Sequence, residues 1–102
     1  MSENVFVKSG RVIDILAVQS GTPTGSWMFK DAPKTAIQAV STAAATIVIE
    51  ASNDGVNAIA TALGTITLAG AGSDGFTTDA PWKYIRARVT SNAGNVNVLV
   101  SN

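Results

Sequence analysis

The chain has 102 residues, a formal net charge of zero, and only 14% of its residues are charged. This length suffices for one domain with one core, and the balanced charge favours neither nucleic acid nor an anionic membrane as a partner. Because the sequence contains no His and no Cys, it lacks the usual general base, metal ligands and thiol nucleophile. We therefore expect no enzyme activity, no cofactor and no metal site.

The composition is that of a β-sheet protein with a modest core. Eight Ile, eleven Val and eleven Thr give many β-branched side chains, which fit the half-buried surface of a pleated sheet. Sixteen Ala account for much of the remaining apolar content, and each buries little area. A core of this kind stabilises a chain of this size only marginally. We therefore expect burial against a partner, including a homo-oligomer.

Period-two alternation between clusters of Gly, Asn, Asp and Pro predicts about eight short strands. Residues 1–20 are interpreted as an N-terminal strand or arm, and residues 21–102 as a β-sandwich, within a single domain overall. The opening segment carries Glu3 and no apolar stretch of the length found in signal peptides, so a cleaved signal is not expected. The predicted strands are Asn4–Lys8, Arg11–Gln19, Trp27–Lys30, Lys34–Val40, Thr46–Ala51, the second half of Ala58–Ala69, Trp82–Thr90 and Asn95–Ser101.

Within these strands the apolar residues share one face, which we expect to lie inside the protein. The alternating sets are Thr35, Ile37 and Ala39; Ile47, Ile49 and Ala51; Ile66 and Leu68; Ile85, Ala87 and Val89; and Val96, Val98 and Val100. Short strands at this spacing, without long helical crossovers, predict an all-β fold: an antiparallel β-sandwich of jelly-roll type.

The connections are predicted from turn-forming residues. Ser52–Gly55 is expected to form a turn and Gly70–Gly75 a flexible loop. The segment Ala58–Leu63 is compatible with a helix. A tight turn at Ser91–Gly94 would join the last two strands as a C-terminal hairpin.

Two acidic residues that precede glycines allow two interpretations. Asp54 with Asn53 and Asn57, or Asp74 with Asp79, could supply oxygen ligands to calcium, which requires several hard donors within one loop. The positions of Asp54 and Asp74 before Gly55 and Gly75 also suit Asx-turns. No calcium-loop spacing is present, so the turn interpretation is favoured.

One strand carries a pattern typical of binding surfaces. Trp82, Tyr84, Arg86 and Arg88 occupy the face opposite the apolar one in Trp82–Thr90, and aromatic and Arg side chains dominate interface hot spots. This face could contact a protein, a sugar or a single nucleic-acid strand, although the neutral charge weakens the last possibility. Alternatively, Trp82 and Tyr84 cap the core, while Arg86 or Arg88 pairs with Glu50 across strands.

The turn Ser52-Asn53-Asp54-Gly55 and the strand Pro81-Trp82-Lys83-Tyr84-Ile85-Arg86-Ala87-Arg88-Val89 together carry a resemblance. They are similar to small β-sandwich virion proteins of tailed bacteriophages, in which such a turn precedes such a strand and a closing hairpin. The similarity covers roughly the last sixty residues. It implies a head decoration, or cement, protein made in the host cytoplasm. Such a protein sits on the capsid surface as a dimer or trimer and bridges subunits of the major capsid protein.

The N-terminal segment suggests a further contact. Val5, Phe6 and Val7 would suit an arm that adds a strand to a neighbouring subunit. Two other functions remain open. Sandwich modules of this type also occur as tail or baseplate accessory proteins, and the turn and the Tyr-Ile-Arg strand also resemble discoidin-type carbohydrate-binding modules.

Overall fold

The computed structural model describes residues 12–30 and 34–101, and these residues form eight strands and no helix. No helix in this part of the chain could therefore cross a membrane. The all-β prediction with about eight strands is confirmed. The strands are β1 (Val12–Gln19), β2 (Met28–Phe29), β3 (Thr35–Ser41), β4 (Ala45–Ser52), β5 (Gly64–Leu68), β6 (Gly72–Thr78), β7 (Tyr84–Asn92) and β8 (Val96–Ser101).

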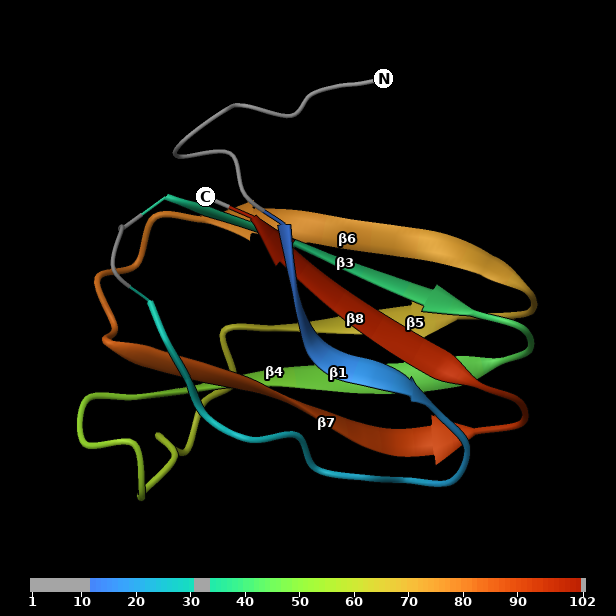
Figure 1. The fold of residues 1–102 in the computed structure, drawn as a ribbon, viewed down its shortest axis with the longest axis horizontal. Coiled ribbons are helices and arrows are strands. Elements are labelled where there is room, and N and C mark those ends of the chain that lie inside the picture. Colours follow the sequence, from blue (N-terminus) through green and yellow to red (C-terminus); the bar gives the residue numbers. More distant parts are fainter. Residues whose placement is uncertain (1–11, 31–33, 102) are drawn as a thin grey trace.

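The strands form two four-stranded antiparallel sheets, with the orders β1-β8-β3-β6 and β2-β7-β4-β5 (Figure 1). The pairs are nested: β1 lies beside β8, β2 beside β7, β3 beside β6 and β4 beside β5. Additional pairing of β3 with β8 and of β4 with β7 completes the sheets. Nested pairing of eight strands across two sheets is the jelly-roll topology, as predicted.

The core is a single apolar layer between the two sheets. Alternate residues of β3, β4, β5, β7 and β8 point into it, and the inward faces predicted from the sequence are confirmed. The largest fully buried side chains include Ile37 of the first sheet and Ile47, Ile49 and Ile85 of the second, so both sheets contribute large side chains to the layer. Small residues such as Ala39 and Ala87 are also fully buried, and they allow the sheets to pack closely.

The predicted C-terminal hairpin is wrong, because β7 and β8 belong to different sheets. Their connection crosses from one sheet to the other beside the β3–β4 connection, which makes the same crossing. Two backbone hydrogen bonds join these connections: Thr42 N–H donates to the Asn95 carbonyl (3.1 Å) and Ala93 N–H to the Ala44 carbonyl (2.9 Å). Alternation predicts which residues face the core, but it does not predict which sheet a strand joins.

The predicted loop Gly70–Gly75 is largely strand, because β6 begins at Gly72 and pairs with β3 along its whole length. Gly75 lies opposite Gln38, and a Cβ atom at Gly75 would collide with the Ile37 carbonyl oxygen. The glycine that suggested a loop is therefore required by close approach of two backbones.

The helix-compatible segment Ala58–Leu63 forms no helix. Its backbone is tied to β4 instead, because Ile59 N–H donates to the Ala51 carbonyl and Leu63 N–H to the Ile49 carbonyl, each at 2.9 Å. The side chains of Ile59 and Leu63 pack against the core. Tertiary packing therefore overrides the local helix preference of this segment.

The first two described strands belong to different sheets: β1 lies in the first sheet and β2 in the second. The predicted strand Arg11–Gln19 corresponds to β1, whereas the predicted strand Asn4–Lys8 lies outside the described residues. The chain after β1 then follows the edge of β7 that faces away from β4 (Figure 1). Val89 N–H donates to the Pro23 carbonyl (2.9 Å), and Lys30 N–H donates to the Lys83 carbonyl (2.7 Å). This route brings the segment that contains Trp27 and Phe29 beside β7.

Replacing Gly75 by Ala should weaken the pairing of β6 with β3, because the added methyl group has no space beside the Ile37 carbonyl. We expect the free energy of unfolding to fall by about 1–3 kcal/mol, as is typical of overpacking, measured by urea denaturation. Gly70→Ala is the matched control, because a Cβ atom at Gly70 meets nothing within 4 Å. Equal stability of the two variants would contradict the assignment.

Candidate functional site

The candidate site is the outer face of the sheet β2-β7-β4-β5. We define the aromatic–arginine face by six residues: Trp27, Phe29, Glu50, Tyr84, Arg86 and Arg88. Alternation positions them, because Ile85, Ala87 and Val89 of β7 point into the core and the residues between them therefore point outward. Phe29 lies opposite Tyr84, and Glu50 lies opposite Arg86.

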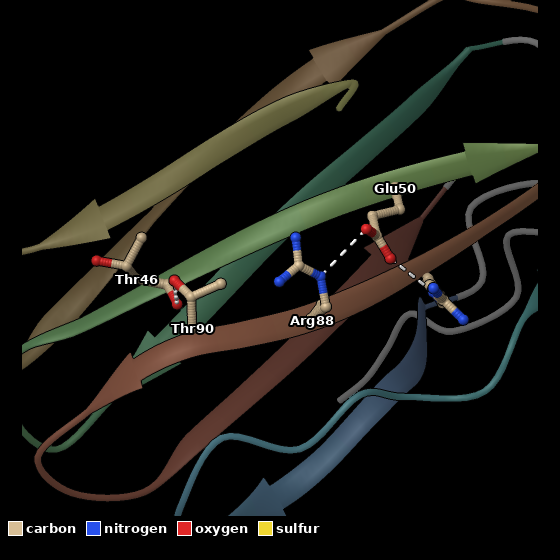
Figure 2. A network of polar contacts seen from close by, with 5 residues as sticks. Thr46, Glu50, Arg88 and Thr90 are labelled. Carbon is tan, nitrogen blue, oxygen red and sulfur yellow. Dashed lines mark hydrogen bonds and ion pairs between the residues drawn. The ribbon is translucent and has the colours of Figure 1, made fainter. Parts of the chain in front are cut away.

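Glu50 bridges the two arginines of β7. Arg86 Nε–H donates to Glu50 Oε1 (2.7 Å), and Arg88 Nε–H donates to Glu50 Oε2 (3.1 Å). Figure 2 shows Glu50 on β4 and Arg88 on β7 pointing toward one another across the outer surface of the sheet. The Glu50 side chain is 12% exposed, against 24% for Arg86 and 41% for Arg88. The carboxylate is therefore enclosed, and the guanidinium groups are more accessible.

The charge of Glu50 is stabilised by this arrangement. Burial raises its pKa, but the hydrogen bonds and positive charges of Arg86 and Arg88 outweigh burial and hold the pKa below its ordinary value of 4.5. Glu50 is therefore a carboxylate at neutral pH. Its single negative charge holds both guanidinium groups in place but balances only one of their two positive charges.

Aromatic rings lie beside this ion-pair network. The Arg86 Cζ atom lies 4.4 Å from the centroid of the Trp27 ring, as in a cation–π contact. The Phe29 and Tyr84 rings meet edge to face, with centroids 5.6 Å apart and an interplanar angle of 72°. Phe29 remains 57% exposed. The face therefore presents apolar ring surface directly beside arginine donors.

The sequence predicted part of this face. Tyr84, Arg86 and Arg88 lie on it as expected, and the predicted pairing with Glu50 is formed by both arginines. Trp82 precedes β7 and packs against the core, so the core-capping interpretation holds for Trp82. The structure instead places Trp27 with these residues.

The sequence analysis did not place Trp27 and Phe29 on this face, because it did not predict which strand lies beside their segment. The available signal was their alternation within Trp27–Lys30, which would have placed both on one face. The other predicted contact residues, Val5, Phe6 and Val7, lie outside the described residues.

The Asp54 turn lies at one end of the face, where Gly55 lies against the Tyr84 ring. Asp54 Oδ1 accepts hydrogen bonds from the Ser52 hydroxyl (2.7 Å) and from the backbone N–H groups of Val56 and Asn57 (2.8 Å each). The Ser52 hydrogen bond makes the largest contribution to a pKa well below the ordinary range. The turn interpretation of Asp54 is confirmed.

Asp74 differs from the prediction. It lies within β6 rather than in a turn, and its Oδ1 atom accepts the N–H of Gly75 (2.8 Å). Asp74 lies in a strand because this part of the chain pairs with β3, where Asp74 lies opposite Ala39. Among the described residues, no group of three or more acidic side chains could hold a metal ion.

A search of solved structures finds the same fold in the crystal structure of the SPBc2 prophage-derived protein YomS. The TM-score is 0.74, and the alignment covers 95% of this chain and 96% of the other, with 12% sequence identity. No protein-family model matches the chain, and a search of curated proteins finds no match. The jelly roll described above is therefore a fold that also occurs, at nearly the same length, in a prophage-derived protein.

Replacing Glu50 by Gln should destabilise the protein at pH 7 by about 1–3 kcal/mol, because two arginines lose a charged hydrogen-bond acceptor. The contribution of Glu50 is fully present above its ordinary pKa and is lost as pH falls through its lowered pKa in the folded protein. Urea denaturation between pH 7 and pH 2 should therefore show the difference between the wild type and Glu50→Gln shrinking as the solution becomes acidic. A difference that does not vary with pH would contradict this account.

Trp82→Ala should lower the free energy of unfolding by about 2 kcal/mol, since its side chain packs against the core. Phe29→Ala is the comparison, because Phe29 is largely exposed and its loss should change stability little. Thermal unfolding of both variants measures this contrast. The reverse order of stabilities would show that Trp82 belongs to the surface.

Proposed function

We propose that this protein is a structural component of a bacteriophage particle, and that it binds the assembled head as a decoration protein. The observation that carries the proposal is the jelly-roll fold, shared over almost the whole length with a prophage-derived protein. The resemblance of Ser52–Gly55 and Pro81–Val89 to tailed-phage virion proteins supports the same function. Jelly rolls recur in viral capsid proteins.

The side chains also favour binding over catalysis. The sequence has no His and no Cys, and the described acidic residues form no cluster of three or more. The aromatic–arginine face combines Trp, Tyr and Arg, the residue types that contribute most to protein interfaces. We therefore propose that the protein has no enzyme activity and acts by binding the major capsid protein.

The proposed mechanism is mass action. A protein that binds the assembled shell, but not the separated subunits, stabilises the shell by the free energy of binding. At a free concentration about one hundred times the dissociation constant, each site contributes about 2.7 kcal/mol. We propose that the protein acts as a dimer or trimer, which would bridge neighbouring capsid subunits.

The test is to add the purified protein to expanded, undecorated capsids. We expect it to sediment with the capsids and to raise the temperature at which they disassemble. Phe29→Ser should weaken this binding, whereas Val40→Ser, an exposed apolar position on the other sheet, should not. Failure of the wild type to bind capsids would contradict the proposal.

The same protein preparation tests the alternatives. Binding to isolated tails or baseplates, without binding to heads, would indicate a tail accessory protein. Binding on a glycan array, without binding to any particle, would indicate a carbohydrate-binding module. Exposed aromatic rings can also contact sugars. Analytical ultracentrifugation measures the oligomeric state.

A further inference from the structure

The aromatic–arginine face has unused hydrogen-bond donors that define the chemistry of its partner, a step that rests on the function proposed above. Arginine has five N–H donors. Among the residues that the structure describes, Arg86 and Arg88 each donate a side-chain hydrogen bond from Nε–H alone, and both bonds go to Glu50. No hydrogen bond joins an Nη atom of either arginine to a described residue, and Figure 2 shows the terminal nitrogens of Arg88 on the side away from Glu50.

These Nη donors, which bond to no residue in 12–30 or 34–101, are held in place before any partner binds. Glu50 fixes both guanidinium groups, and the Trp27 ring supports that of Arg86. An arginine side chain normally loses considerable rotamer freedom when it is immobilised at an interface. Here Glu50 and Trp27 already restrict the arginine side chains, so the arginines lose less rotamer freedom when a partner binds.

The net charge of the face favours a partner that carries negative charge. Two guanidinium groups and one carboxylate give the network a net positive charge of one. A second copy presenting the same face would bring two positive networks together. At the Tyr84 end, the carboxylate of Asp54 is already bonded to donors of its own turn, which makes it a poor acceptor for a second copy.

We propose that the aromatic–arginine face binds a protein surface that presents a carboxylate beside an apolar side chain. The carboxylate accepts hydrogen bonds from the Nη groups of Arg86 and Arg88, and the apolar side chain packs on the Phe29 and Tyr84 rings. Arginine and carboxylate groups match in geometry and charge. A nucleic-acid phosphate has similar chemistry, but the zero net charge of the chain opposes binding to a polyanion.

The first test uses a peptide and needs no capsid. A short capped peptide that alternates glutamate and phenylalanine is titrated into the nitrogen-15-labelled protein, and the same peptide with glutamine in place of glutamate is the control. We expect the glutamate peptide to shift the NMR signals of the Arg86 and Arg88 Nε–H groups and of the Trp27 indole. Absence of these shifts, or equal shifts with the glutamine peptide, would overturn the inference. Stronger binding of single-stranded DNA at the same residues would also overturn it.

The second test measures capsid binding of Arg88→Gln, which removes the more exposed arginine and leaves the pair of Arg86 with Glu50 intact. We expect affinity to fall about tenfold, as for the loss of one charged hydrogen bond. Lys34→Gln is the matched control, because it removes the same charge from an exposed position near β3 of the other sheet. Thermal unfolding of each variant checks that the fold is retained.

The two tests separate the two proposals. Capsid binding by the wild type that is unchanged in Arg88→Gln would overturn the inference about the partner and leave the decoration function standing. No capsid binding by the wild type would overturn the decoration function, and the peptide titration would then decide the inference by itself.

Discussion

The structure depends on one constraint. Every second residue of most strands is apolar, and these apolar residues are buried together in one layer between the two sheets. Ile47, Ile49 and Ile85 fill the centre of that layer. Because side chains alternate along a strand, burial of this set forces every intervening residue to the outside. The outer residues of β4 and β7 are thereby brought into register, and Glu50 lies opposite Arg86 as a direct consequence of the packing of its neighbours.

The nested pairing of the jelly roll completes the face. The segment after β1 has to cross from the first sheet to the second, and it does so along the edge of β7 that faces away from β4, where backbone hydrogen bonds hold it. This crossing brings Trp27 and Phe29, more than fifty residues away in sequence, beside Tyr84 and Arg86. The face is thus a product of the topology, and no single strand contains it.

The sequence predicted the features that depend on alternation and missed those that depend on pairing. Inward faces and fold class followed from periodicity, and Tyr84, Arg86 and Arg88 were correctly placed on an outer face. The strand β6 was missed because Gly75, which suggested a loop, is required by close contact with β3, and no local pattern reveals that contact. The C-terminal hairpin was wrongly predicted for a similar reason: a turn sequence is compatible both with a hairpin and with a crossing between sheets. Trp82 was assigned to the outer face by extending the strand two residues beyond its actual start.

We propose that the outer face of the sheet β2-β7-β4-β5 contacts the phage shell, and an electron cryo-microscopy reconstruction of capsids decorated with this protein tests this contact most directly. The account predicts density for the protein on the shell, with this sheet facing the capsid and with Arg86 and Arg88 within hydrogen-bonding distance of capsid carboxylates. A reconstruction in which the opposite sheet, β1-β8-β3-β6, faces the shell and the aromatic–arginine face is turned to solvent would contradict it.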